Sequence, residues 1–384
     1  MKKLAFVFDG MGFGGIERVG TDYIRICIDL GYQVDVYNLN PSAEEFAKKN
    51  LPSEVRYIPY KLSRKGCPET YSFGIQKWWW GKYVYPVISP ILSLKQIIEK
   101  LFFIKREYDV AIAMAGHIND LSFVAKNYIK AKKKIVWCHG NVISYLAICD
   151  AYPILYKKID SIVTLSSAGE KDIYGGRKYL HEKTITKIYN PTFICSKTID
   201  KAKVEKLKTE YGDYVLYIAR FEQGKSQDIA IKAIKRLKEK GFDRKILFAG
   251  DGSKKEEMIE LAEKEGIREN CIFLGNCNDV ENYISASYIN LLSSKWEGLP
   301  TVIIEAMSLG KPCIMTNSDD GEVSSNGKYC LLNEIDDIEG ISDSLKLLYE
   351  DQNVYQQYIE LSIQRSKAFQ PETIKKEIIR LLEE

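Results

Sequence analysis

LAFVFDGMGFGGIER, residues 4–18, joins an apolar run to a glycine-rich turn. The apolar run Leu4–Phe8 contains aromatic and branched side chains and has the length of a buried strand. The residues after the glycines, to about Asp29, have helical spacing. A strand, a tight turn and a helix in this order predict an α/β domain built on a parallel sheet.

The same alternation of short apolar runs and helical segments continues along the chain in two series. The predicted strands are 4–8, 33–37, 110–114, 134–138 and 161–165 in the first series, and 214–218, 245–249, 271–274, 289–292 and 313–316 in the second. Such alternation is typical of parallel sheets covered by helices on both faces. At 384 residues the chain exceeds the usual size of a single core. A hinge is predicted near 190–196, because Pro191 disfavours helix at Asn190.

The formal net charge of +3 conceals a difference between the two halves. Residues 1–190 carry 28 Lys and Arg against 18 Asp and Glu, whereas residues 191–384 carry 27 against 34. A basic half predicts contact with an anionic partner, either nucleic acid or anionic lipid. The sequence has no zinc-finger spacing, basic helix or aromatic RNA-binding motif, so we expect no nucleic-acid partner.

Cysteine usage and hydropathy predict a cytoplasmic protein. The nine cysteines are odd in number and never spaced C-x-x-C, as expected of free thiols in a reducing compartment. No signal-peptide core follows Met1. The longest apolar stretch, residues 83–94, is interrupted by Pro86 and Pro90 and is shorter than the roughly 20 residues that span a bilayer. Any membrane contact is therefore expected to be peripheral.

The glycine turn is compatible with more than one ligand. Gly10, Gly12 and Gly15 match the G-x-G-x-x-G pattern of dinucleotide-binding turns, which would indicate an NAD-dependent oxidoreductase. That pattern also requires an acid at the end of the second strand, where this sequence has residues 37–40, Tyr-Asn-Leu-Asn. In either case glycines let backbone N–H groups approach a phosphate at a helix N-terminus. A tight turn that binds no ligand is the alternative.

A second informative stretch, WEGLPTVIIEAMSLGKP at residues 296–312, places two glutamates eight positions apart. Pro300 and Thr301 are suitable helix-start residues, and Gly310 is a suitable stop. Glu297 is then expected in the loop before the helix and Glu305 inside the helix. A pair of glutamates alone is more often a solvated helix face, so the whole stretch carries the argument.

This stretch resembles the E-x7-E region of family-4 retaining glycosyltransferases, in particular those of bacterial capsule and exopolysaccharide synthesis. Other motifs of the family occur in its order. They are GGIER at 14–18, WCHG at 137–140, YNP at 189–191, ARFEQGK at 219–225 and FAGDG at 248–252. Ala219 and Ser226 stand where the family's G-R-x4-K-G element has glycines. Residues 40–110 carry no motif that aligns, and acceptor identity is expected there.

The resemblance implies a GT-B fold, in which two Rossmann-like doubly wound domains face each other across a cleft. Residues 1–190 would bind the acceptor, residues 191–369 the nucleotide sugar, and residues 370–384 would form a helix that crosses back to the first domain. The implied reaction moves a hexose or N-acetylhexosamine, with retention, from a nucleoside-diphosphate sugar. UDP is the expected nucleotide, and the acceptor would be lipid-linked or a saccharide in bacterial surface polysaccharide synthesis.

The resemblance also assigns roles to individual residues. Arg220 and Lys225 would grip the diphosphate, Glu305 the ribose and Glu297 a hydroxyl of the sugar ring, while His139 would lie beside the donor sugar. The catalytic set is thus His139, Glu297, Arg220 and Lys225. The donor-binding set is Gly14, Gly15, Arg220, Lys225, Gly250, Asn276, Cys277, Glu297, Leu299, Pro300, Thr301 and Glu305. Two surface cations and a core histidine are the alternatives for Arg220, Lys225 and His139.

The residues predict the acceptor side and the metal requirement less directly. His117, Asn119 and Asp120 follow a predicted strand, and Asp120 could face the acceptor hydroxyl. The sequence has no D-x-D tripeptide, so no metal and no further cofactor are expected beside the nucleotide sugar. The cations of Arg220 and Lys225 would serve in place of a metal. Without an evident nucleophile, attack from the leaving-group face is the expected route to retention.

The basic half also predicts docking on the anionic cytoplasmic leaflet of the cell membrane. Trp78, Trp79 and Trp80 stand beside cations such as Lys77 and Lys82. Residues 87–106 follow with apolar residues at near-helical spacing between lysines, as in an interfacial helix. The alternative is a core helix with a solvated basic edge and the tryptophans packed beneath a loop. A non-catalytic, membrane-associated protein of the same fold is the remaining rival to an enzyme.

Overall fold

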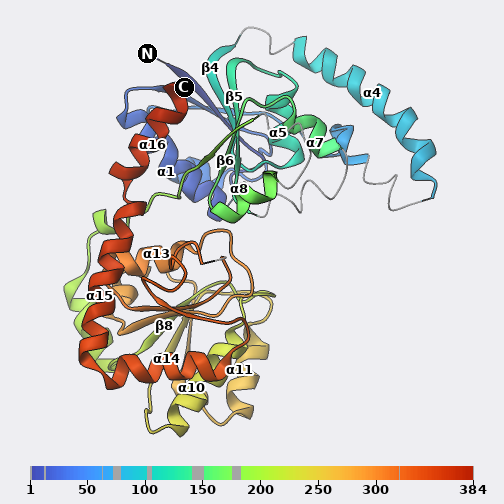
Figure 1. Ribbon diagram of the computed structural model, residues 1–384. Coiled ribbons are helices and arrows are strands. Elements are labelled where there is room, and N and C mark those ends of the chain that lie inside the picture. The colour runs from blue at the N-terminus through green and yellow to red at the C-terminus, as the bar shows by residue number, and fades with distance from the viewer. Residues whose placement is uncertain are drawn as a thin grey trace. The chain divides into compact units, whose positions relative to one another are not determined.

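The computed structural model describes residues 2–12, 14–62, 64–71, 79–101, 106–140, 151–174, 183–319 and 321–383. The chain forms two compact units (Figure 1). Unit 1 contains Met1–Pro191 together with Ile374–Glu384, and unit 2 contains Thr192–Thr373. Lys77 and Trp78 of the predicted membrane-contacting segment lie outside the described residues.

Unit 1 is built on a seven-stranded parallel sheet of order β3-β2-β1-β4-β5-β6-β7. The strands are β1 (Lys3–Phe8), β2 (Gln33–Asn38), β3 (Arg56–Pro59), β4 (Glu107–Ala113), β5 (Lys130–Cys138), β6 (Ser161–Thr164) and β7 (Thr184–Lys187). The five strands predicted in this half are confirmed. The sequence pattern did not predict β3 and β7, because both are four residues long and only partly buried.

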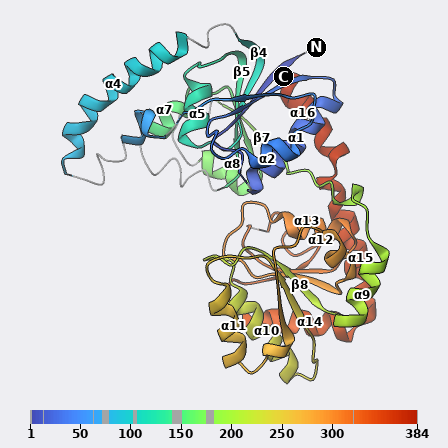
Figure 2. The ribbon, with the colours of Figure 1, turned by 180° about the vertical axis from the view of Figure 1, so that it is seen from behind.

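Helices cover both faces of this sheet (Figure 2). The helices of the unit are α1 (Gly15–Asp29), α2 (Glu45–Asn50), α4 (Gly81–Leu101), α5 (Ile118–Ala125), α7 (Ala151–Tyr156), α8 (Ser167–Tyr174) and the C-terminal α16 (Pro371–Glu383), with the short 3₁₀ helix η1 (Arg64–Gly66). Helix α4 does not cover the sheet but lies at the side of the unit (Figures 1 and 2). Phe123 of α5 packs on Tyr37 of β2 in the core between helices and sheet. Lys133 of β5 donates to the carbonyl of Leu381 in α16 at 2.7 Å, which anchors the end of the chain to unit 1.

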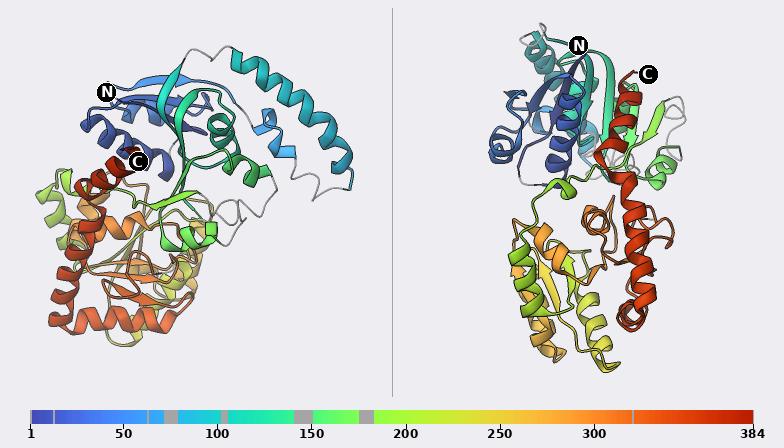
Figure 3. Two further views of the ribbon diagram at one scale, coloured as in Figure 1. Left: turned by 45° about the horizontal axis from the view of Figure 1, so that its top comes forward. Right: turned by 90° about the vertical axis from the view of Figure 1, so that its left-hand side faces the viewer.

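Unit 2 contains a six-stranded parallel sheet of order β10-β9-β8-β11-β12-β13 (Figure 3). Its strands are β8 (Val215–Ile218), β9 (Ile246–Ala249), β10 (Cys271–Gly275), β11 (Ile289–Leu292), β12 (Cys313–Thr316) and β13 (Leu331–Asn333). Its helices are α9 (Lys201–Tyr211), α10 (Gln227–Glu239), α11 (Lys255–Lys264), α12 (Val280–Ala286), α13 (Thr301–Ser308), α14 (Ile338–Glu350) and α15 (Gln352–Ser366), with the 3₁₀ helices η3 (Ile194–Ser196), η4 (Arg268–Asn270) and η5 (Lys367–Phe369). The five strands predicted in this half are confirmed.

Strand order fixes where each unit can bind a ligand. In unit 1 the first strand, β1, lies between β2 and β4, and in unit 2 the first strand, β8, lies between β9 and β11. The chain therefore winds outward in both directions from β1 and from β8. In open α/β sheets ligands bind at the carboxyl ends of the strands, where this reversal occurs. The expected positions are beside the ends of β1 and β4, and of β8 and β11.

Helix α4 differs from the core helix that was the alternative for residues 87–106. Its apolar side chains Val87, Ile91 and Leu94 are exposed, and so is Trp79 just before it. The interpretation of a core helix with buried tryptophans is therefore wrong for the described part of this segment. The described helices do not include one with the length and hydropathy needed to cross a membrane.

Candidate donor and acceptor sites

Two loops of unit 2 meet at the carboxyl ends of β8 and β11. The loop after β8 spans residues 219–226 and the loop after β11 spans residues 293–300. Three backbone carbonyls of the first loop accept hydrogen bonds, one from a residue of β8 and two from residues of the second loop. Lys295 donates its backbone N–H to Gly224 at 2.8 Å, Ser293 donates its hydroxyl to Ser226 at 2.7 Å, and the Tyr217 hydroxyl donates to Lys225. The two loops thus form one rigid wall at the switch point.

Lys225 and Glu297 are ion-paired across these loops. The Lys225 ammonium lies 2.6 Å from a carboxylate oxygen of Glu297, and the two side chains are 25% and 14% exposed. The Glu297 backbone N–H donates to Ser318 at 2.7 Å and fixes the position of the loop. An ammonium has three N–H donors, so Lys225 can hold Glu297 and still donate to an oxygen of a ligand. Arg220 is exposed at the start of the same loop.

Ser226 adopts a left-handed conformation with φ of 51° and ψ of 45°, directly before α10. For a residue with a side chain this conformation costs on the order of 1 kcal/mol. Ser226 is the position at which the glycosyltransferase motif has glycine, so the geometry explains the glycine of the motif. The hydrogen bond from Ser293 to the Ser226 carbonyl, together with burial, holds this strained residue in place.

Helix α13 places Glu305 beneath the second loop. Pro300 is the N-cap residue and Thr301 the first helical residue, as predicted for the start of this helix. Glu305 is only 5% exposed and Leu299 is also buried. The N-terminus of α13 carries partial positive charge, which favours an anion near residues 299–301.

The remaining predicted donor residues lie at the ends of β9 and β10. Gly250 follows β9 with φ of 141° and donates its N–H to Gly275 at 2.8 Å. Asn276 and Cys277 follow β10, and the Cys277 thiol points to the Gly275 carbonyl at 3.7 Å. The predicted donor residues of unit 2 are therefore all placed at the carboxyl edge of one sheet.

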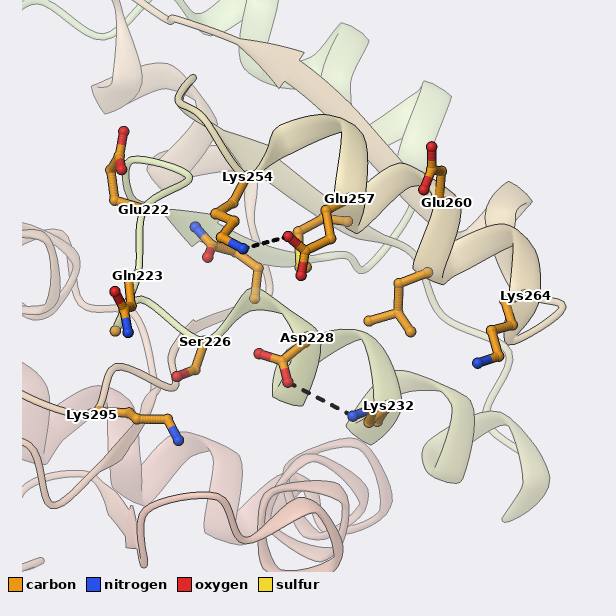
Figure 4. Close-up of a pocket in the computed structure, with 14 residues that line it drawn as sticks. Glu222, Gln223, Ser226, Asp228, Lys232, Lys254, Glu257, Glu260, Lys264 and Lys295 are labelled. Carbon is orange, nitrogen blue, oxygen red and sulfur yellow. Dashed lines mark hydrogen bonds and ion pairs between the residues drawn. The ribbon is translucent and has the colours of Figure 1, made fainter.

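A pocket of about 570 Å³ lies beside this edge, between the N-terminal parts of α10 and α11 (Figure 4). Four lysines and four carboxylates line it, and Figure 4 shows Lys254 paired with Glu257 and Lys232 paired with Asp228. Its described lining does not include Arg220, Lys225, Glu297 or Glu305. Because its charges balance and two lysine–carboxylate pairs already form within it, this pocket is a poor site for a diphosphate, and we do not assign the donor to it.

In unit 1 an aspartate and a histidine form a pair at the switch point, and the sequence did not predict this pairing. Asp9 follows β1 and His117 follows β4, and the His117 Nδ1 lies 3.2 Å from a carboxylate oxygen of Asp9. Burial raises the pKa of Glu17 in the first turn of α1, and the charges of His117 and Asp9 act on the same carboxyl in opposite directions. Asp9 stands directly after the first strand, and this place in the sequence could have identified it as a candidate site residue.

Asn119 and Asp120 are buried and hold the backbone. The Asp120 carboxylate is fully buried and accepts from the N–H groups of Ala115 and Gly116 at 2.7 and 2.9 Å. Burial raises its pKa to about 6, and the charge of nearby His117 opposes this rise. Asn119 donates to the Leu62 carbonyl at 3.0 Å. These contacts fix the turn that carries His117 and commit the Asp120 carboxylate to the backbone.

His139 follows β5, next to β4. Burial lowers the pKa of His139 to about 4, while a hydrogen bond with the Met114 backbone opposes this effect. The imidazole is therefore neutral at neutral pH, with its Nε2 atom buried. A neutral imidazole can donate or accept a hydrogen bond but supplies no positive charge to a departing diphosphate.

The last predicted site residues are the glycines of the turn between β1 and α1. Gly14 is the N-cap residue of α1, in extended backbone conformation, and Gly15 is the first residue of that helix. Both lie at the switch point of unit 1, because α1 follows β1.

Within the described ranges, no cluster of three or more His, Cys, Asp or Glu side chains has metal-binding geometry.

The two sheets define a protein of the doubly wound α/β class. Residues 198–365, which cover most of unit 2, match the family model "Glycosyl transferases group 1". The chain is 27% identical, over 93% of both proteins, to a Haemophilus influenzae protein named as an uncharacterized glycosyltransferase. It is 25% identical, over 60% of this chain and 61% of the relative, to a Campylobacter jejuni N-acetylgalactosaminyltransferase that acts on a diphospho-undecaprenol acceptor according to its name.

Among solved structures, the chain is similar to HepE of Anabaena in complex with UDP, with a TM-score of 0.76 at 16% identity over 99% of both chains. A Staphylococcus aureus TarM mutant in complex with UDP is similar with a TM-score of 0.72 at 13% identity over both whole chains. These likenesses establish the GT-B fold, with its two Rossmann-like domains, as predicted.

Proposed function

We propose that this protein is a retaining glycosyltransferase that uses a UDP-sugar as donor. It transfers a hexose or N-acetylhexosamine to a lipid-linked or saccharide acceptor in the synthesis of a bacterial surface polysaccharide. The observation that carries the proposal is the ion pair between Lys225 and Glu297, which joins the loops after β8 and β11 at the switch point of the domain that matches the glycosyltransferase family.

The chemistry follows from where charge develops. When the bond between the sugar C1 and the diphosphate oxygen breaks, negative charge grows on the diphosphate and positive charge on the sugar ring. Arg220 and Lys225 stabilise the diphosphate, as a bidentate fork and as a point charge respectively. Glu297 is held by Lys225 and accepts from a ring hydroxyl. Two protein cations at the leaving group remove the need for a metal.

The acceptor side is assigned to unit 1. The pair of His117 and Asp9 at the end of β4 and β1 orients the acceptor hydroxyl, and neutral His139 accepts a hydrogen bond from a hydroxyl of the donor sugar through Nε2. The acceptor hydroxyl attacks C1 from the face that the diphosphate leaves, and a diphosphate oxygen takes the proton of the hydroxyl. Retention then needs no enzymic nucleophile, in contrast with a double displacement.

A lipid-linked acceptor places the enzyme at the cytoplasmic face of the cell membrane. The support for this part of the proposal is the excess of basic residues in residues 1–190. The printed names of two Campylobacter jejuni relatives, which specify diphospho-undecaprenol acceptors, add to it. An NAD-dependent oxidoreductase is disfavoured, because Asn38 ends β2 where ribose recognition by that class requires an acid.

Glu297 and Glu305 should give different kinetic signatures. Glu297→Gln should mainly lower kcat, because the residue positions the reacting sugar ring. Glu305→Gln should mainly raise KM for the donor, because the residue holds the ribose in ground state and transition state alike. Steady-state release of UDP from a panel of UDP-sugars measures both parameters.

The matched control for this pair is Glu257→Gln, which removes a carboxylate from the pocket beside α11 that we do not assign to the donor. It should leave both parameters near those of the wild type. The same signature in Glu297→Gln and Glu305→Gln would refute the division of roles.

A further inference from the structure

Helix α4 has its apolar side turned away from the protein. Seven of its apolar side chains are between 50% and 63% exposed, and Trp79 directly before it is 81% exposed. The seven are Tyr83, Val87, Ile91, Leu94, Ile97, Ile98 and Leu101. Steps of three and four residues place them on one side of the helix. We call this set the outer face of α4.

The opposite side of α4 contacts the protein, where Ile88 and Leu92 are half-buried beside polar side chains. Gln96 is 2% exposed, donates to the Gly66 carbonyl at 3.1 Å, and accepts from the Lys126 ammonium at 2.8 Å. The Tyr128 hydroxyl lies 3.5 Å from Glu99, and the Lys100 ammonium lies over the Tyr128 ring at 5.5 Å. A surface helix of a globular protein normally buries its apolar stripe and exposes its polar one.

The position of α4 leaves its outer face open within unit 1. Figures 1 and 2 both show α4 at the side of the unit, beyond α5 and α7. A continuous apolar surface on a helix of 21 residues, about 30 Å long, is larger than the scattered apolar residues of an ordinary surface. Such a surface marks a binding site for an apolar partner.

We propose that the outer face of α4 docks on an anionic lipid bilayer, with its apolar side chains at the boundary between headgroups and acyl chains. This proposal rests on the proposed function, because a lipid-linked acceptor is presented at that boundary. The present proposal goes beyond the proposed function, because it assigns the membrane contact to α4 and to the outer face of that helix. The helix lies in the plane of the interface rather than across the bilayer.

The charges around α4 favour lipid with negative headgroups. Between residues 79 and 101 the chain has three lysines against the single acid Glu99; Lys82 and Lys95 are exposed, whereas Lys100 lies over the Tyr128 ring. Beside the end of α4, a cavity of about 470 Å³ is lined by Asn127, Tyr128, Lys130, Ala131 and Lys134. Trp79, Trp80 and Tyr83 add amphipathic rings, which favour the headgroup boundary.

A second copy of the chain is the competing occupant of this face. Val84, Val87, Ile91, Leu94, Ile98 and Leu101 have the spacing of a coiled-coil seam. Two features disfavour that reading. Pro86 and Pro90 interrupt the backbone hydrogen bonds of the helix, and Tyr83 and Ile97 widen the apolar face beyond a two-position seam. A fluid interface tolerates both features better than a packed seam does.

The test is sedimentation of the full-length protein with vesicles of phosphatidylcholine alone or with one third phosphatidylglycerol. Wild type should bind the anionic vesicles and be released by high salt. The triple variant Ile91→Ser/Leu94→Ser/Ile98→Ser should bind at least ten-fold more weakly. Because these side chains are exposed, the variant should fold and should bind UDP as the wild type does. Ile335→Ser/Leu347→Ser, which removes exposed apolar side chains of unit 2, is the matched control and should bind vesicles normally.

Fluorescence supplies a second readout. Trp79 should shift its emission to shorter wavelength on anionic vesicles, and the change should be smaller in Trp79→Phe. Equal binding to neutral and anionic vesicles, or no binding, would overturn the proposal. A wild-type dimer without lipid that becomes a monomer in the triple variant would assign the face to a second copy instead. Failure of the wild type to bind UDP would count against the proposed function alone and leave the vesicle result intact.

Discussion

Lys225→Ala and Arg220→Ala should each lower kcat/KM for a UDP-sugar by about 10²–10³-fold, as expected when one preorganised donor to a developing anion is removed. Both variants should also weaken UDP binding. The Lys225 ammonium already sits 2.6 Å from Glu297 in a loop fixed by hydrogen bonds to three of its carbonyls, so it needs little reorganisation to meet a phosphate. Release of UDP from the UDP-sugar measures the effect.

Removing Lys225 also leaves the Glu297 carboxylate, 14% exposed, without its cation. The double variant Lys225→Ala/Glu297→Gln therefore separates lost phosphate contact from the cost of an unpaired carboxylate. Lys254→Ala is the matched control, since Lys254 pairs with Glu257 in the balanced pocket of Figure 4. Turnover at the wild-type level in both Arg220→Ala and Lys225→Ala would contradict the assignment of the diphosphate site.

Gly250→Ala should destabilise unit 2 by roughly 3 kcal/mol and abolish UDP binding at ordinary concentrations. Gly250 has φ of 141°, and a Cβ atom there would lie 2.1 Å from the Ala219 carbonyl oxygen. The backbone cannot move aside easily. Ala219 donates to Ala249 at 3.1 Å, and Gly250 donates to Gly275 at 2.8 Å. Relief of the clash must therefore displace the start of the loop that carries Arg220 and Lys225.

Gly241→Ala is the control that separates the cost of the steric clash from the cost of placing alanine at a positive φ. Gly241 has φ of 93°, but a Cβ atom there would have no other atom within 4 Å. Its replacement should cost only about 1 kcal/mol. Chemical denaturation of both variants gives the comparison. Equal losses at the two positions would mean that contact with Ala219 is unimportant.

The central part of each sheet could be predicted from the sequence, because buried parallel strands are continuous apolar runs bounded by loops. The strands at 33–37, 161–165 and 289–292 were recognised in this way and are confirmed. Strands β3, β7 and β13 were not predicted, because they are three or four residues long and only partly buried. Such strands are specified by pairing with a neighbour, and single-sequence periodicity does not contain that information.

The loops of the candidate site could be predicted because their motifs are local in sequence. Arg220, Lys225, Glu297 and Glu305 were selected in advance, and the structure places them around the ends of β8 and β11. The ion pair between Lys225 and Glu297 joins residues 72 positions apart and could not be derived from spacing. The pairing of Asp9 with His117, which are 108 positions apart, was missed for the same reason.

Helix α4 shows a different limit of sequence reasoning. Amphipathic spacing was visible in residues 87–106, but spacing alone does not say which side of a helix faces the protein. The contacts of Gln96 with Gly66 and Lys126 decide this, and they depend on residues 30 positions away. The side that carries Gln96 faces inward, so most of the described apolar residues that resembled a core form an exposed surface, whereas Ile88 and Leu92 are half-buried.

The most direct test of the donor assignment is thermal denaturation of the wild-type protein with UDP, GDP, ADP or NAD. We expect UDP at 100 times its dissociation constant to stabilise the protein by roughly 2.7 kcal/mol. Arg220→Ala should lose most of this stabilisation at the same UDP concentration, and NAD should have no effect on either protein. Stabilisation by NAD and not by UDP, or equal UDP stabilisation in the wild type and in Arg220→Ala, would contradict a UDP-sugar site at the ends of β8 and β11.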